Sequence, residues 1–161
     1  MSHIEKKLKS LGFRLPDPLQ LPPGVELPFP WVNVRGDRVF VSGHGPLEED
    51  GTLAKPLGQV GGTVSIDEAH DLARKTALSI LASLKRELGD LDCITGWCRV
   101  FGMVNSAPGF DRQPAVINGF SDLILEIFGP AVGRHARSAV GMAALPFNMA
   151  VEIEAELLIR E

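Results

Sequence analysis

The sequence of 161 residues contains no tyrosine, only two cysteines and only 6% aromatic residues. It has neither a CxxC nor an HxxxH pattern, which argues against a zinc module. Cys93 and Cys98 are an odd number of positions apart, so on the single strand expected below they would lie on opposite faces and could not form a disulfide with each other. Two free thiols suit a reducing compartment, which predicts a cytoplasmic protein.

Long apolar runs and basic blocks are also missing. No apolar run approaches the roughly 20 residues that span a bilayer, and no basic block exceeds two residues. The 16 Lys and Arg residues are outnumbered by 20 Asp and Glu residues, which gives a net charge of −4. This balance argues against membrane insertion and against a dedicated nucleic-acid binder. With 45% apolar residues the chain is long enough to bury its own core as one domain, so small molecules or proteins are the expected partners.

The N-terminal part differs from the remainder of the chain. Apolar residues at helical spacing predict a short amphipathic helix: Ile4, Leu8 and Leu11. Six prolines then fall within residues 15–30, which forbids regular helix and favours an extended segment across the surface. We therefore expect an N-terminal helix and proline-rich extension over residues 1–28, followed by an α+β domain over residues 29–161.

A hairpin and a long helix are predicted at the start of this domain. Residues 31–34 and 39–41 are rich in β-branched and aromatic residues and flank a turn at Gly36, which indicates a β-hairpin. A capping box begins at Ser65, and apolar residues then recur at helical spacing until Gly89 ends the pattern. Small alanines on the apolar face of this helix favour close packing against a sheet.

The second half of the chain predicts one more helix and three strands. They are a strand over residues 93–104, a helix over residues 114–128, and strands over residues 137–144 and 150–159. A short strand near residues 57–60 is optional. The order of hairpin, helix, strand, helix, strand and strand predicts an α+β fold in which two helices cover one face of a mixed sheet.

The last predicted strand alternates strictly between apolar and acidic residues. One face would carry three carboxylates: Glu152, Glu154 and Glu156. A solvated face is the simplest account of them. Because like charges along one face repel, a nearby arginine or a second subunit would account for them better.

Arg137 begins the strand before this one, behind a glycine-containing loop. A guanidinium at a strand end offers two parallel donors to a small carboxylate, which a lysine cannot match. The structural alternative is an ion pair with a carboxylate of the last strand, and the sequence leaves both interpretations open.

A second candidate is His44, which stands between Gly43 and Gly45 after the predicted hairpin. The two glycines would let backbone amides approach a ligand and hold the imidazole in a loop; the alternative is a turn with an exposed histidine. His44 and His135 have no third ligand at a recognisable spacing, so no metal is predicted. Asn118 on the second predicted helix is either polar surface or part of a site.

Together these residues resemble the RidA/YjgF family, also labelled endoribonuclease L-PSP. The resemblance covers about residues 29–159 and depends on residues 41–46, 84–91, 110–118, 135–146 and 151–154. It implies a chorismate-mutase-like α+β subunit of the bacillus type. It also implies a homotrimer whose sheets form a central barrel, with three ligand clefts between the subunits.

Members of the main branch of this family hydrolyse 2-imino or enamine acids to 2-oxo acids and ammonia without a cofactor. By resemblance, Arg137 matches the arginine that binds the substrate carboxylate and Glu152 the carboxylate proposed to orient the attacking water. Gly43 matches a backbone contact to the substrate, and Asn118 matches the asparagine of the second helix.

The sequence departs from the family pattern around this site. Trp31 or Phe29 lies near the position where family members carry a tyrosine, His44 replaces a glutamine, and Ala139 stands where cysteine is frequent. The resemblance therefore supports two functions: hydrolytic deamination of imino acids, or a trimeric protein that binds a small carboxylate metabolite without turnover. An endoribonuclease rests on the family label alone, and the net negative charge argues against it.

Overall fold

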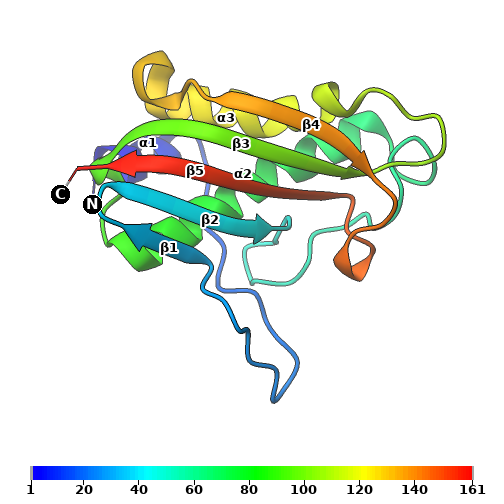
Figure 1. The fold of residues 1–161 in the computed structure, drawn as a ribbon, viewed down its shortest axis with the longest axis horizontal. Coiled ribbons are helices and arrows are strands. Elements are labelled where there is room, and N and C mark those ends of the chain that lie inside the picture. Colours follow the sequence, from blue (N-terminus) through cyan, green and yellow to red (C-terminus); the bar gives the residue numbers. More distant parts are fainter. Residues whose placement is uncertain (1, 161) are drawn as a thin grey trace.

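The last strand of the chain, β5 (Val151–Ile159), lies at the centre of a five-stranded sheet with the order β1-β2-β5-β3-β4 (Figure 1). The computed structural model describes residues 2–160. The other strands are β1 (Val32–Arg35), β2 (Arg38–His44), β3 (Ile94–Asn105) and β4 (Ala136–Met142). Only the β3–β4 pair is parallel, so the sheet is mixed, as predicted.

Two long helices, α2 (Ile66–Leu88) and α3 (Gln113–Gly133), cover the same face of the sheet (Figure 1). The predicted capping box starts α2: the Ser65 hydroxyl accepts a hydrogen bond from the amide of Glu68, and the Glu68 carboxylate accepts one from the amide of Ser65. The prediction of an α+β sandwich with two helices on one face is confirmed.

The N-terminal helix α1 (His3–Ser10) is also present where the apolar spacing predicted it. Ile4 and Leu8 are buried, and the amide of Ile4 donates to the Asp92 carboxylate at 2.9 Å. Residues 15–30 contain neither helix nor strand and connect α1 to β1.

The alternation along β5 has the predicted orientation. Its apolar side chains are fully buried beneath the helices: Val151, Ile153, Ala155 and Leu157. The three glutamates lie on the opposite, open face of the sheet. An arginine does accompany one of them, because Arg38 Nη2 lies 3.9 Å from Glu156 Oε2 and Arg99 faces Glu156 across the ladder.

Several predicted boundaries were wrong. Cys93 lies in a 3-10 turn, η1 (Leu91–Cys93), and not on a strand, because the Asp90 side chain accepts from the amide of Asp92 and starts that turn. The argument that both cysteines share one strand therefore fails, although Cys93 and Cys98 are both free. Near residues 57–60 there is no strand, only isolated bridges made by Val60.

The C-terminal half also differs in detail. A kink at Gly129, where φ is 71° and ψ is 170°, interrupts α3, so the predicted stop after residue 128 marks the kink and the helix resumes to Gly133. Strand β4 ends at Met142 rather than at residue 144, and a 3-10 turn, η2 (Pro146–Asn148), leads into β5.

By length and mean hydropathy α3 is the one described helix that could cross a membrane, although polar residues interrupt its apolar sequence. It contains Asp122 and Glu126, and its apolar residues, including Phe120 and Ile124, are buried in the core. We therefore interpret α3 as the core helix of the sandwich.

We predict that Gly119→Ala destabilises the fold, because Gly119 lies where α3 touches α2. A Cβ atom there would lie 2.0 Å from the carbonyl oxygen of His70. The clash should exceed the usual gain from replacing a helical glycine and lower the free energy of unfolding by at least about 2 kcal/mol. Urea unfolding measures this. Gly96→Ala is the matched control, since nothing lies within 4 Å of a Cβ at Gly96. Equal stability of the two variants would contradict the prediction.

Candidate functional site

A β-bulge near the end of β2 shapes the candidate site. Val41 pairs with Ala155 and His44 pairs with Ile153, so β2 has one more residue than β5 between these pairs. The predicted loop position of His44 was therefore wrong: the strand continues through the bulge and ends at His44. Gly43 lies against Glu152, because a Cβ there would lie 3.0 Å from the carboxylate carbon. A side chain at position 43 would therefore press against this carboxylate and require it to shift.

His44 is buried, with 5% of its surface exposed, so the alternative of an exposed turn histidine was also wrong. Its Nδ1 lies 2.6 Å from the carbonyl oxygen of Ser42, which can only accept, so Nδ1 carries the proton. Nε2 then accepts from the Ser83 hydroxyl at 2.8 Å, and Ser83 Oγ in turn accepts from Arg86 Nη2 at 2.9 Å. Burial lowers the pKa of His44 from 6.5 to about 4, and the imidazole is neutral near pH 7.

Beside His44 is a cavity of about 170 Å³ that contains several of the predicted site residues. It is lined by Leu19, Phe29, Trp31, Gly43, His44, Gly45, Leu47, Leu53, Ser83, Arg86, Pro146, Phe147, Met149 and Glu152. The Trp31 ring packs against the His44 ring with centroids 5.0 Å apart. The cavity therefore brings together Trp31, Gly43, His44 and Glu152.

Glu152 provides the carboxylate of this cavity. Its side chain is half-buried, and burial together with the negative charge of Glu154 raises its pKa above the ordinary value. Among residues 2–160, no side chain or backbone donor hydrogen-bonds to it. A half-buried carboxylate with an elevated pKa and a vacant hydrogen-bonding capacity is typical of a functional group.

Arg137 lies elsewhere, on the edge strand β4. Its Nη1 donates to Asn118 Oδ1 at 2.9 Å and to Ser121 Oγ at 3.1 Å, and its Nη2 lies 3.4 Å from the carbonyl oxygen of Pro114. The alternative of an ion pair with the last strand was wrong, because β3 lies between β4 and β5 and the guanidinium is on the helix face of the sheet. Ala139, two residues further along β4, packs against the core on the same face.

His135 repeats the arrangement found at His44. Its Nδ1 donates to the carbonyl oxygen of Gly133 at 2.7 Å, and its Nε2 accepts from Ser121 Oγ at 2.9 Å. Burial also lowers the pKa of His135. In His44 and His135 alike both ring nitrogens are engaged in hydrogen bonds, and no three His, Cys, Asp or Glu side chains of residues 2–160 gather in a metal-binding group.

The predicted site residues of one chain thus fall into two separate groups. The first contains Glu152 on the open face of the sheet, and the second contains Arg137 and Asn118 on the helix face. Within a single chain Arg137 and Glu152 do not meet.

Two serines of these networks, Ser83 and Ser121, were not among the predicted site residues. Their spacing of three from Arg86 and Asn118 was the available signal, because residues three apart share one helix face.

Comparisons with known proteins agree with this architecture. The model of the family described as "YjgF/chorismate_mutase-like, putative endoribonuclease" matches residues 6–157. The match thus begins within α1, earlier than residue 29, where the sequence resemblance was expected to begin. The chorismate-mutase-like fold predicted from the sequence is confirmed.

Individual relatives extend the similarity over most of the chain. TCP17 of Trypanosoma cruzi is 43% identical over 120 residues, which are 74% of this chain and 74% of that protein. An Agrobacterium tumefaciens protein of unknown function has a TM-score of 0.85 and 42% identity, covering 97% of this chain and 91% of that one. A Shewanella oneidensis protein described as a putative endoribonuclease has a TM-score of 0.85 and 29% identity, covering 97% and 99%.

We predict that His44 makes stability depend on pH. Between pH 6.5 and about 4 the unfolded chain binds a proton at His44 that the folded chain does not, so stability is full above pH 6.5 and falls as the pH decreases. From pH 7 to pH 5 this histidine should remove about 2 kcal/mol from the free energy of unfolding.

Urea unfolding of the parent and of His44→Gln at both pH values isolates this contribution, because His135 and Glu152 titrate in both proteins. An unchanged pH dependence in His44→Gln would contradict the prediction.

Proposed function

Since the chain belongs to the YjgF/chorismate mutase-like family, we propose that it hydrolyses 2-imino or enamine acids to 2-oxo acids and ammonia. The reaction takes place in clefts between the subunits of a homotrimer. The observation that carries this proposal is that Arg137 lies on one face of the sheet and Glu152 on the other. A single chain therefore does not bring the two side chains together.

Arg137 binds the substrate carboxylate in this proposal. Asn118 and Ser121 hold Nη1, and the planar guanidinium is thereby fixed before a ligand arrives. A guanidinium held in one plane presents parallel N–H donors to a carboxylate, and this pairing fixes the orientation of a small acid. The hydrogen bonds from Arg137 to neutral partners leave its positive charge available to the substrate.

Glu152 acts on the water. Its carboxylate takes a proton from water as the water oxygen bonds to the C=N carbon, and Glu152 passes this proton to the imine nitrogen to give an amino alcohol. The hydroxyl proton then moves through Glu152 to the nitrogen as the C–N bond breaks, so that the nitrogen leaves as ammonia and the oxygen becomes the carbonyl of the 2-oxo acid. A raised pKa brings Glu152 closer to the working pH and makes it a better proton carrier than an exposed glutamate.

The homotrimer supplies the contact that one chain lacks. Strand β4 is an edge of the sheet with one side unpaired, and the open face carries three glutamates that a lone subunit would leave in water. In the proposed assembly β4 of one subunit brings Arg137 to the cavity that contains Glu152 in the next, and cyclic symmetry repeats the cleft three times. The protein acts in the cytoplasm and needs no cofactor, nucleic acid or membrane.

A binding protein without turnover is the second candidate. The chain has no tyrosine, so the hydroxyl expected near the cleft is absent, and Trp31 instead packs against a neutral His44. Such a protein would hold a 2-oxo acid at Arg137 but would not release ammonia from an imine.

We predict that two inactive variants restore each other. Arg137→Ala and Glu152→Gln each disable every cleft of their own trimers, but a mixed trimer contains clefts with Arg137 from one chain and Glu152 from the other. Random assembly of equal amounts should return about one quarter of the parent's activity, since each of the two positions is intact in half of the chains.

Co-expression with two affinity tags and an assay of ammonia release measure this recovery. Co-expressed chains that both carry Arg137→Ala are the control and should stay inactive. Mixed trimers without recovered activity would exclude a cleft shared between subunits, and a monomeric mass in sedimentation equilibrium would exclude the trimer.

We also predict the pH profile. The Glu152 carboxylate is ionised only above its raised pKa, so kcat/KM should fall on the acid side with an apparent pKa above the ordinary value of 4.5. Glu152→Gln should lower turnover on the order of a hundredfold and abolish this limb of the profile. Glu154→Gln, the neighbouring control, should keep the limb and shift it to lower pH, because the negative charge of Glu154 raises the pKa of Glu152. Unchanged turnover in Glu152→Gln would rule out its role.

A further inference from the structure

We propose that the cavity beside Glu152 selects 2-imino acids with a large apolar side chain, above all an aromatic one. This inference rests on the proposed function, which supplies the hydrolysis of the imine. It adds which side chain the substrate carries. The proline-rich residues 15–30 provide one wall of the cavity and the η2 turn provides the opposite one.

The cavity offers few polar groups to a ligand. His44 uses both ring nitrogens, and the Ser83 hydroxyl donates to His44 while accepting from Arg86, so neither has a donor left for a substrate. Apart from Glu152 and the Arg86 guanidinium, the remaining side chains of the wall are apolar: Leu19, Phe29, Trp31, Leu47, Leu53, Pro146, Phe147 and Met149. Beyond Glu152, Arg86 and the Trp31 indole N–H, a polar substrate side chain would lose its water against this wall without gaining partners.

The volume suits a single ring. The cavity measures about 170 Å³. An apolar cavity of roughly 150 Å³ is enough to bind benzene in an engineered protein. A phenyl or large branched side chain therefore fits, whereas a methyl group would leave most of the apolar wall in contact with water.

The proline-rich wall is built into the fold. The amide of Asp17 donates to the carbonyl oxygen of Glu49 at 2.9 Å, and the Gln20 side chain donates to the carbonyl oxygen of Asp50 at 3.0 Å. A Cβ at Gly51, where φ is +81°, would lie 2.3 Å from the carbonyl oxygen of Pro18. The loop before residue 52 is thus shaped to receive this segment, which places Leu19 at the cavity.

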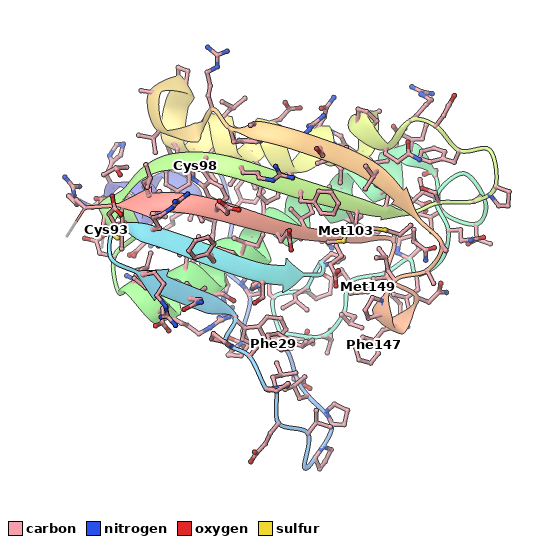
Figure 2. All side chains as sticks on the ribbon, viewed as in Figure 1. Phe29, Cys93, Cys98, Met103, Phe147 and Met149 are labelled. Carbon is pink, nitrogen blue, oxygen red and sulfur yellow. The ribbon has the colours of Figure 1, made fainter. Side chains whose placement is uncertain are left out.

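Two exposed phenylalanines flank the mouth. Phe29 is 46% exposed and its ring meets Trp31 edge-on at 5.9 Å, while Phe147 is 65% exposed. Phe147 has a φ of 56°, a conformation that is costly for an aromatic residue and is typical of functional turns. In Figure 2 both rings lie at the end of the sheet marked by Met149, and all three side chains line the same cavity.

The test compares imines formed in situ from phenylalanine and from alanine, with ammonia release as the measure. In the parent, kcat/KM should favour the phenylalanine-derived imine at least tenfold, which is about the low end of what an apolar pocket discriminates. Phe147→Asn keeps a residue that tolerates the left-handed turn but removes the ring, and it should reduce this ratio by about tenfold. Phe29→Ala should reduce it in the same direction.

Val25→Ala is the matched control, because Val25 is 46% exposed in the same segment but does not line the cavity; it should keep the parent ratio. A ratio near one in the parent, or the parent ratio in both phenylalanine variants, would overturn the inference. Calorimetry with pyruvate and phenylpyruvate separates it from the proposed function. Tighter binding of phenylpyruvate that is lost in Phe147→Asn supports the apolar site even if no imine is hydrolysed, and that combination would refute only the hydrolase.

Discussion

The alternation of side chains along β5 is the constraint on which the rest of the structure depends. Because β5 is the central strand, its apolar residues must close the core beneath α2 and α3, and a slip of one residue would bury three glutamates instead. The same alternation fixes Glu152 on the open face. Arg137 instead lies on the helix face of the sheet, because it pairs with Val100, whose side chain is buried there. The placement of Arg137 and Glu152 on opposite faces of the sheet is therefore a consequence of how the core is closed.

Two hydrogen-bond networks of one design hold the arginines. In each network a histidine donates to the carbonyl oxygen of the residue two positions before it and accepts from a serine, whose oxygen accepts from an arginine. Neutral histidine suits this role because it provides one donor and one acceptor at fixed angles. Both networks are fully satisfied at the histidine and serine, which makes them rigid. Arg86 also reaches the carbonyl oxygen of Pro16, and this contact ties the first network to the proline-rich segment.

Local sequence patterns predicted the parts of this fold that depend on local forces. The capping box at Ser65, the hairpin turn and the alternation before Ile159 each involve residues close in sequence, and each was found. The bulge before His44 was not predictable, because it depends on how β2 aligns with β5. The contact of His44 with Ser83 depends on how α2 packs on the sheet, and the partners of Arg137 depend on how α3 packs beside β4. These are properties of the assembled sheet rather than of any segment.

The proline-rich residues 15–30 form a wall of the cavity without helix or strand. A wall beside a cavity must stay in place while its own apolar groups face an open space, so it receives little help from packing. Prolines restrict the unfolded chain and thereby reduce the entropy lost when the segment is fixed. A few backbone hydrogen bonds and the close approach at Gly51 then suffice to hold it. In the proposed cavity, Leu19 and Phe29 therefore stand on a backbone that is ordered during folding, so the cost of ordering that backbone does not weaken binding.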